Sequence, residues 1–382
     1  MSRAGAQAIG GLEGPRPRLD YPSGTRDWLP DQYAREGDVI DSEYEVERVL
    51  GEGGMGIVVA ARDLVFGDEV AIKLLRPELR RRPEAVIRFL REAHETMRIS
   101  SEHVVHVSGI GRVADGTPYM VMELLEGADL ARILRERGVP FGVEQAVDYL
   151  LQACEAVAEA HALGIVHRDL KPANLFLEQR PDGSTSIKVL DFGISKSGDP
   201  EDEADFSIGA RPSREIVGSP AYMSPEQVLD WTSVDGRADV WSLGATLYEL
   251  LTGELVFGGG SLEAILARIS ADSPVPLGRG RSEVPTGLER VIIACLEKAP
   301  ARRLPSVADL ARALLPFAPE SSRPTVARIE AIAPKGTTTP LELAGWRRRR
   351  RRRLLRDGAR ACALVLVGAA AAMLLAGGFH LL

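Results

Sequence analysis

Cysteine is scarce in this 382-residue chain, which contains only Cys154, Cys295 and Cys362. Three thiols so far apart argue against a disulfide framework and a thiolate zinc site, and they are typical of a reducing, intracellular compartment. The length allows two or three domains, or one two-lobed enzyme domain that occupies most of the chain.

Lysine is also rare, because arginine supplies most of the positive charge. Six positions keep it: Lys73, Lys171, Lys188, Lys196, Lys298 and Lys335. Positive charge is not in excess either, since the formal net charge is −7 although residues 347–360 contain nine arginines and one aspartate. This distribution argues against a general nucleic-acid-binding surface and for one basic patch with a specific task.

The N-terminus lacks a signal peptide, because no apolar run follows a charged start. Residues 1–42 are rich in Gly, Pro, Arg and Asp, and we predict a flexible leader there. Residues 318–346 are rich in Pro, Ser and Thr, and we predict a linker.

The stretch VLGEGGMGIVVAA, residues 49–61, contains a G-x-G-x-x-G pattern formed by Gly51, Gly53 and Gly56. β-Branched runs lie on both sides, and after the turn FGDE comes VAIKLL, which predicts antiparallel strands. A dinucleotide-binding loop needs a helix at the glycines, and a Walker loop needs Gly-Lys-Ser/Thr; the sequence offers neither. The glycines therefore belong to a β-hairpin.

The remaining periodicity predicts a small β-rich lobe followed by a larger helical lobe. Residues 84–100 have apolar side chains at helical spacing, and two strand-like runs follow before Gly127. Beyond Gly127 the spacing becomes helical, with a hairpin turn at 181–183, and helices dominate from 226 to about 317.

Five motifs occur in one order, and in this the chain resembles the bacterial, eukaryotic-like (Hanks-type) serine/threonine protein kinases. They are the glycine loop with Val58, VAIK ending at Lys73, HRDLKPAN at 167–174, DFG at 191–193 and SPE at 224–226. The resemblance implies an α+β, two-lobed protein-kinase-like fold over residues 43–317. It also implies transfer of the ATP γ-phosphoryl group to Ser or Thr hydroxyls of proteins, with Mg²⁺, or Mn²⁺ as an alternative.

The resemblance places ATP between the two lobes. Lys73 is expected to contact the α- and β-phosphates and to pair with Glu92, with Glu95 as the alternative acid. The glycine-loop backbone would cover the phosphates, and Asp129 would contact the ribose. The implied ATP-binding residues, which include an adenine pocket and the hinge backbone, are Leu50, Gly51, Glu52, Gly53, Gly54, Met55, Gly56, Val58, Ala71, Lys73, Glu123, Leu125, Asp129 and Phe176.

The resemblance also assigns the catalytic loop. Asp169 is expected to accept or orient the proton of the acceptor hydroxyl, and Lys171 to screen the γ-phosphate. Asn174 and Asp191 are expected to hold the metal through oxygen, the ligand that a hard cation prefers. His167 is expected to pack, with no proton role.

In the larger lobe the resemblance implies two structural contacts. Glu226 and Arg303 would form a buried ion pair that fixes the end of the activation segment. Asp239 would clamp the backbone of the catalytic loop.

Arg168 precedes the catalytic aspartate, and in the family this marks an activation segment that is ordered by phosphorylation. Our hypothesis is that Ser213 is the principal autophosphorylation site, with Ser207 as the alternative. Ser219 is expected near the catalytic loop. The acidic run GDPEDEAD at the start of the segment is more simply a solvated loop.

The C-terminal run ACALVLVGAAAAMLLAGGFHLL, residues 361–382, has 22 residues without formal charge. As a helix it would be about 33 Å long, which is enough to cross a bilayer. Because arginines stay on the cytoplasmic side, we predict a single-pass membrane protein with a basic juxtamembrane segment at 347–360 and a cytoplasmic kinase domain. An Ala-rich buried or amphipathic helix is the alternative. Gly368 and Ala372 would let two such helices pack closely as a homodimer.

Two other functions stay open: a pseudokinase scaffold and a phosphotransferase for small molecules. The intact Lys73, Asp169, Asn174 and Asp191 favour a catalyst, and the segment GSPAYMSPEQ favours a protein acceptor.

Overall fold

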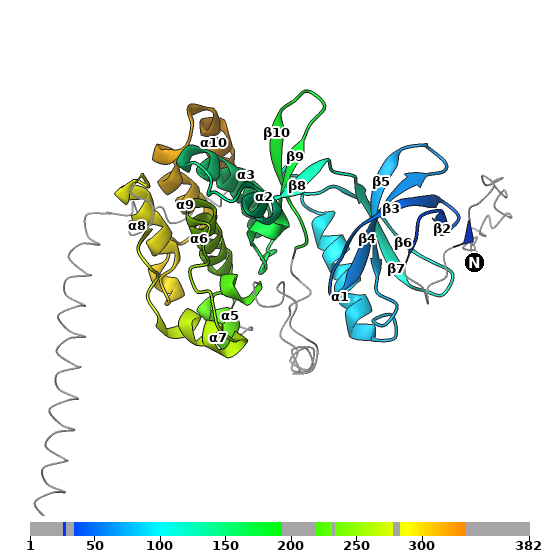
Figure 1. Ribbon diagram of the computed structural model, residues 1–382, viewed down its shortest axis with the longest axis horizontal. Helices are drawn as coiled ribbons and strands as arrows, with labels where there is room; N and C mark the ends of the chain where they lie inside the picture. The colour runs from blue at the N-terminus through cyan, green and yellow to red at the C-terminus, as the bar shows by residue number, and fades with distance from the viewer. Residues whose placement is uncertain (1–25, 28–33, 193–218, 231–233, 278–282, 333–382) are drawn as a thin grey trace, which may run out of the picture. The chain divides into compact units, whose positions relative to one another are not determined.

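The computed structural model in Figure 1 describes residues 26–27, 34–192, 219–230, 234–277 and 283–332. The chain divides into two compact units, Met1–Ala333 and Pro334–Leu382, and every described residue belongs to the first. Within that unit a strand-rich lobe precedes a helical lobe, as the periodicity predicts.

The smaller lobe is built on a seven-stranded sheet in the order β1-β2-β3-β4-β5-β7-β6. Neighbouring strands are antiparallel except β1 and β2, which are parallel. The strands are β1 (Arg26–Asp27), β2 (Asp38–Ile40), β3 (Tyr44–Glu52), β4 (Gly56–Asp63), β5 (Glu69–Leu75), β6 (Val107–Arg112) and β7 (Pro118–Glu123). The predicted glycine hairpin is therefore the connection from β3 to β4.

Helix α1 (Pro83–Thr96) packs against β6 and β7. Pro83 lies in its first turn, where a missing N–H loses no intrahelical bond. Its buried side chains recur at helical spacing and form one stripe: Ala85, Phe89, Glu92, Ala93 and Thr96. Glu92 is the carboxylate of that stripe, so the fold turns this charge inward.

The larger lobe contains eight described helices and a three-stranded sheet. The helices are α2 (Leu130–Arg137), α3 (Val143–Ala162), α5 (Pro225–Leu229), α6 (Arg237–Thr252), α7 (Leu262–Ala271), α8 (Thr286–Cys295), α9 (Val307–Leu314) and α10 (Arg323–Ile332). The sheet has the order β10-β9-β8, with β8 (Gly127–Asp129), β9 (Leu175–Gln179) and β10 (Thr185–Val189). The predicted turn at 181–183 joins β9 to β10.

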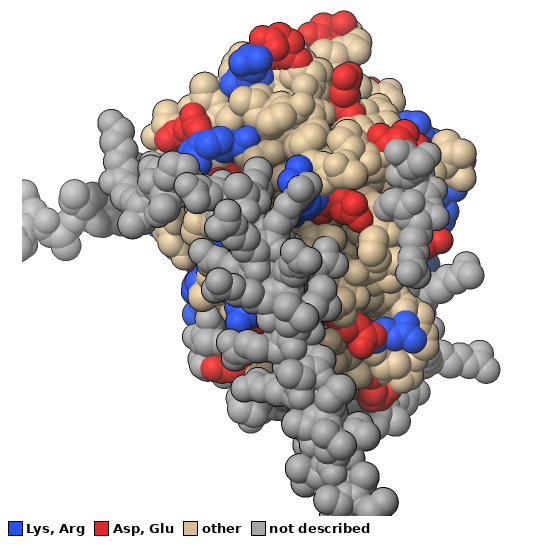
Figure 2. Space-filling model, turned by 90° about the vertical axis from the view of Figure 1, so that its left-hand side faces the viewer, with Lys and Arg blue, Asp and Glu red and all other residues tan. Residues whose placement is uncertain are grey.

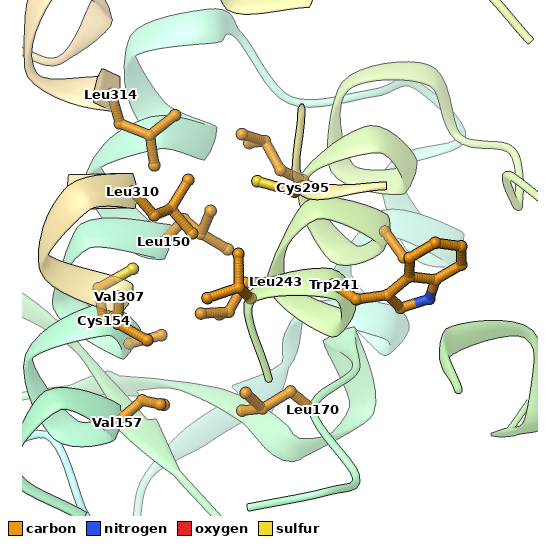
Figure 3. Close-up of a cluster of buried hydrophobic side chains, with 14 of the residues drawn as sticks. Leu150, Cys154, Val157, Leu170, Trp241, Leu243, Cys295, Val307, Leu310 and Leu314 are labelled. Atoms are coloured by element: carbon orange, nitrogen blue, oxygen red, sulfur yellow. The ribbon is translucent and has the colours of Figure 1, made fainter. Parts of the chain in front are cut away.

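The core of the larger lobe lies where α3, α6, α8 and α9 meet, and Figure 3 shows apolar side chains from these helices pointing toward one another. Helix α6 is buried on nearly every side, and its buried residues include Asp239, Ser242 and Thr246 besides the apolar ones. A side chain at Gly244 would place its Cβ 2.5 Å from the Cβ of Cys295. Glycine at this position therefore allows α6 and α8 to approach.

The prediction of a flexible leader over residues 1–42 is wrong for its last part. Strand β2 lies in this region, and Ala34, Val39 and Ile40 are buried in the smaller lobe. The side chain of Asp41 accepts a hydrogen bond of 2.8 Å from the Tyr119 hydroxyl of β7. Three buried apolar residues and one hydrogen bond do not change the composition of a Gly-, Pro- and Arg-rich segment noticeably. The prediction, which rested on composition, therefore missed the strand.

The predicted linker over 318–346 is also wrong in its first half, because α10 lies there. Val326 and Ile329 are buried against the core of the larger lobe. Arg328 forms a bidentate pair with Glu155 of α3, with N–O distances of 2.6 and 2.8 Å. The proline- and serine-rich start of this segment masked a short helix whose stability comes from tertiary packing.

Within the described ranges, no helix combines the length and the apolar character needed to cross a bilayer. The predicted span, 361–382, and the arginine-rich segment, 347–360, lie outside the described residues. On the face shown in Figure 2, acidic and basic side chains of the described chain are interspersed.

Candidate active site

Lys73 of β5 stands between two carboxylates. Its Nζ lies 2.7 Å from an Oε of Glu92 on α1 and 2.6 Å from an Oδ of Asp191, which follows β10. The side chains of Lys73 and Glu92 are buried, whereas 55% of the Asp191 side chain is exposed. The lysine therefore joins the two lobes and leaves a carboxylate accessible beside it. The pairing with Glu92, rather than Glu95, is the predicted one.

These three charges shift one another's pKa. Burial alone would lower the pKa of Lys73, but Asp191 and Glu92 outweigh it and raise that pKa. Although 55% of the Asp191 side chain is exposed, the protein around it removes part of its hydration and opposes its ionisation; Lys73 outweighs this effect and holds the pKa of Asp191 below the usual range. For Glu92, burial is the largest effect and raises the pKa to about 7. Lys73 lowers this pKa, but not enough to offset burial, and Asp191 raises it further. The same ammonium group therefore leaves the pKa of Glu92 raised and that of Asp191 lowered.

A second cluster surrounds Asp169 on the loop between α3 and β9. The Nζ of Lys171 lies 3.0 Å from a carboxylate oxygen of Asp169. The Asn174 amide nitrogen donates to the backbone carbonyl of Asp169 at 2.8 Å and to its carboxylate at 3.2 Å. With the nitrogen engaged, the Asn174 amide oxygen is the atom left to act as a ligand.

His167 packs as predicted and has a defined tautomer. Its Nδ1 accepts from the backbone N–H of Asp169 at 3.2 Å, so Nε2 carries the proton and donates to the carbonyl of Leu190 at 3.1 Å. The ring lies 4.7 Å from that of Phe192. Burial lowers the pKa of His167, which keeps it neutral. It orients the loop and has no free site for a proton.

Asp239 of α6 clamps the same loop. Its carboxylate accepts 2.8 Å hydrogen bonds from the backbone N–H groups of His167 and Arg168, and a third, also of 2.8 Å, from Nε2 of His161. Burial alone would raise the pKa of Asp239, but the His161 contact and its other partners keep it below the usual range. A buried anion with several donors holds the loop rigid.

Two non-glycine residues of the site have a left-handed backbone: Arg168, with a φ of 66°, and Asp191, with a φ of 46°. Such conformations cost about 1–3 kcal/mol each and persist only where surrounding contacts enforce them. Asp239 supplies those contacts for Arg168, and Lys73 supplies one for Asp191.

Strand register places the predicted adenine-pocket residues with Lys73. Val58 pairs with Lys73 across β4 and β5, and Ala71 pairs with Met122 across β5 and β7. Cross-strand partners share a sheet face, as do alternate residues of one strand. Val58, Ala71, Lys73 and Met122 therefore line one face. Phe176 lies on β9, in the small sheet of the larger lobe.

Residues 44–314, well over half of the chain, match the family described as the protein kinase domain. This chain belongs to the protein kinase family. Serine/threonine-protein kinase Pkn1 of Myxococcus xanthus is 40% identical over 271 residues, which cover 71% of this chain and 38% of Pkn1. Serine/threonine-protein kinase PknB of Mycolicibacterium smegmatis is 36% identical over 274 residues, which cover 71% of this chain and 42% of PknB. The kinase-family chain thus spans less than half the length of these relatives.

The same fold occurs in a crystal structure of the Mycobacterium tuberculosis PknI kinase domain. The two superpose with a TM-score of 0.57 and 26% sequence identity, covering 75% of this chain and all of that one. The predicted two-lobed kinase fold is therefore confirmed.

Other predicted residues of the kinase domain lie as follows. Glu226 and Arg303 form the expected ion pair, with N–O distances of 2.5 and 2.6 Å. Asp129 caps α2 by accepting from the N–H of Arg132 at 2.8 Å. The side chain of Glu123 accepts from the Lys188 Nζ at 2.7 Å, and its backbone N–H donates to the His106 carbonyl at 3.0 Å. Ser207 and Ser213 lie outside the described residues, and of Ser219 only the backbone is described.

Sequence reasoning missed three contacts of the kinase domain. Ser224 and Gln227 form a capping box at the start of α5, and the Gln227 amide donates to the Arg168 carbonyl at 2.9 Å. His161 supports Asp239, and Arg76 contacts the glycine loop. The S-x-x-Q spacing of the capping box was readable, whereas the other two contacts join positions that are distant in sequence.

The raised pKa of Glu92 predicts a pH dependence of stability. Its pKa rises from 4.5 to about 7 on folding, so the folded state binds more protons between these values. The contribution of Glu92 to the free energy of unfolding is therefore expected to fall as pH rises from about 4.5 to 7. Glu92→Gln should reduce this fall by about 2 kcal/mol. Urea unfolding of the nucleotide-free protein at pH 5 and pH 7.5 measures it.

Glu95→Gln, in the same helix, is the matched control and should keep the wild-type slope. An unchanged slope in Glu92→Gln would contradict the assignment of this proton to Glu92.

Proposed function

We propose that this chain is a protein serine/threonine kinase, which transfers the γ-phosphoryl group of ATP to Ser or Thr hydroxyls of proteins. The observation that carries the proposal is the convergence of two clusters. One is Lys73 with Glu92 and Asp191, and the other is Asp169 with Lys171 and Asn174. Asp191 interacts electrostatically with Asp169 and Lys171, so the two clusters lie close together. They bring ammonium groups, carboxylates and an amide to one place, which suits a transferring phosphoryl group.

The residues present fit ATP with a divalent ion. Asp191 offers a carboxylate with more than half of its side chain exposed, and Asn174 offers an amide oxygen, both hard ligands suited to Mg²⁺ or Mn²⁺. The face that carries Val58 and Ala71 is apolar and suits an adenine ring. Bound Mg²⁺ would supply the positive charge that neutralises the β- and γ-phosphate oxygens.

The chain's own groups divide the remaining work. Lys73, held by Glu92, presents a fixed ammonium to the phosphates and loses little side-chain entropy when they bind. Asp169 orients the acceptor hydroxyl and takes up its proton, while Lys171 keeps that carboxylate in place at 3.0 Å. Because Asp239 and His167 fix the loop backbone, these groups are arranged before the substrates arrive.

A protein acceptor is favoured by the segment that leads into α5. The Tyr222 hydroxyl donates to Glu249 of α6, and Ser242 donates to the Tyr222 carbonyl at 2.9 Å. The ion pair of Glu226 and Arg303 fixes the next residues. A platform anchored this firmly suits an extended peptide better than a small molecule. The relatives named above are serine/threonine-protein kinases, which agrees with this acceptor.

A labelled-phosphate assay tests the proposed function. The full chain, γ-labelled ATP and Mg²⁺ are incubated with protein acceptors or with small alcohols and sugars, and Asp169→Asn serves as the blank. Label in phosphoserine or phosphothreonine of protein is expected. Label only in small molecules would favour the phosphotransferase, and ATP binding without any transfer would favour the pseudokinase scaffold.

We further propose autophosphorylation of the activation segment, with Ser213 as the main site and Ser207 as the alternative. The Nε atom of Arg168 is buried and has no hydrogen-bond partner among the described residues, which suits a phosphate ligand. Phosphopeptide mapping of the active enzyme is expected to find Ser213 modified. Two unmodified serines would reject the proposal.

We also propose that residues 361–382 anchor the enzyme in the membrane, with the arginines of 347–360 and the kinase domain on the cytoplasmic side. The support is the uncharged run of 22 residues and the basic segment before it. The full chain is expected in the membrane fraction and to resist extraction by alkaline carbonate. Release by carbonate would favour the alternative of an Ala-rich buried or amphipathic helix. We propose that two such membrane-spanning helices pack as a homodimer through Gly368 and Ala372. Cross-linking of the full chain should then give a dimer.

A further inference from the structure

Arg76, the residue that follows β5, contacts the glycine loop through three groups. Its backbone N–H donates to the Met55 carbonyl at 3.0 Å. Its Nε donates to the Gly53 carbonyl at 2.6 Å, and its Nη2 lies 3.7 Å from a carboxylate oxygen of Glu52. The loop is therefore tied to β5 at its tip, by a side chain that no kinase motif in the sequence indicates.

The Nε contact fixes the orientation of one peptide group. In a trans peptide the carbonyl of one residue and the N–H of the next point in opposite directions. Because the Gly53 carbonyl points at Arg76, the N–H of Gly54 points away from it. Gly53 uses its own N–H to donate to the Gly56 carbonyl at 2.8 Å. The donor of the Gly53–Gly54 peptide, the N–H of Gly54, therefore points to the side away from Arg76.

The glycines themselves do not enforce this orientation. A Cβ at Gly51 or Gly54 would meet nothing within 4 Å, and at Gly53 the nearest atom would lie at 3.9 Å. Only Gly56 is constrained, because its Cβ would lie 2.6 Å from the Leu74 carbonyl. Because glycine adopts positive and negative φ with similar ease, the Gly53–Gly54 peptide can turn either way unless a contact to its carbonyl or N–H holds it. Arg76 supplies the missing constraint.

We infer that Arg76 is a positioning residue that turns the Gly54 N–H toward the nucleotide phosphates. This inference rests on the proposed function, since it assumes that ATP binds under the loop. A donor fixed in advance binds an anion without the cost of ordering the loop. The fixed N–H should therefore strengthen the binding of ATP but not that of adenosine, which has no phosphate.

The experiment compares two substitutions that differ in one donor. In Arg76→Gln the side-chain amide nitrogen lies the same number of bonds from Cα as the arginine Nε, and it donates without charge. Arg76→Met has similar length but no donor. Calorimetry measures the binding of adenosine and of a non-hydrolysable ATP analogue to the full chain with Mg²⁺. Arg62→Met, which removes an exposed guanidinium from β4 of the same lobe, controls for net charge.

Arg76→Met is expected to weaken binding of the ATP analogue about tenfold while adenosine binding stays within about twofold. Arg76→Gln should retain affinity for the analogue within about threefold of wild type, and Arg62→Met should match wild type. Equal losses for both ligands, or a glutamine variant as weak as the methionine variant, would overturn the inference. Wild-type protein that binds neither ligand would instead reject the proposed function itself.

Discussion

Replacing Asp169 by asparagine is expected to lower kcat for phosphoryl transfer by about 10²–10⁴-fold, the usual contribution of a positioned proton acceptor. The amide has the same shape as the carboxylate but cannot take up the hydroxyl proton. The contact from Asn174 to the Asp169 backbone carbonyl, at 2.8 Å, does not depend on the side chain. The KM for ATP should therefore change by less than about threefold.

Steady-state kinetics with varied ATP measures both constants. A matched control is Asp182→Asn, since Asp182 lies in the exposed turn between β9 and β10 and should leave kcat unchanged. An Asp169→Asn enzyme that keeps more than a tenth of wild-type kcat would show that the proton leaves by another route.

Replacing Arg303 by methionine is expected to lower the free energy of unfolding by about 3–5 kcal/mol. The Arg303 side chain is fully buried, and it neutralises Glu226, whose side chain is only 10% exposed. Its guanidinium also donates to the carbonyls of Glu297, Arg237 and Lys298 at 2.8, 2.9 and 3.2 Å. The substitution removes these hydrogen bonds and leaves the Glu226 carboxylate without its buried cation.

Chemical unfolding of Arg303→Met, Glu226→Gln and the double variant gives a double-mutant cycle. Because each single change leaves the other partner uncompensated, the double variant should be more stable than the sum of the two losses predicts. Arg312→Met removes an exposed pair with Glu330 and should cost less than about 1 kcal/mol. Additive losses in the cycle would mean that the two residues do not stabilise each other.

Much of the site was predictable because it is written in short motifs. Each of Lys73, Asp169, Asn174 and Asp191 stands in a fixed local pattern, and β5, the catalytic loop and the end of β10 bring them together. Glu92 needed a second signal, the helical stripe on which Phe89 also lies. A carboxylate in an apolar stripe must find a cation once the helix packs, and Lys73 is that cation.

The rest was not predictable because it depends on packing between distant residues. Arg76 is one arginine among many, and only the fold brings it to Gly53. Gly56 also has a second role that the motif does not indicate. A Cβ there would lie 2.6 Å from the Leu74 carbonyl of β5, so glycine is required for strand pairing as well as for a ligand. Strand β2 and helix α10 are short and polar in part, and tertiary contacts stabilise them.

Helix α10 has a practical consequence for anyone who shortens this protein. The family match ends at residue 314, yet Ile329 is fully buried and Arg328 neutralises Glu155 beyond that point. A fragment cut at 314 would expose the apolar surface of α3 and α9 to water and leave Glu155 without its cation. Soluble, crystallisable fragments should therefore extend through Ile332.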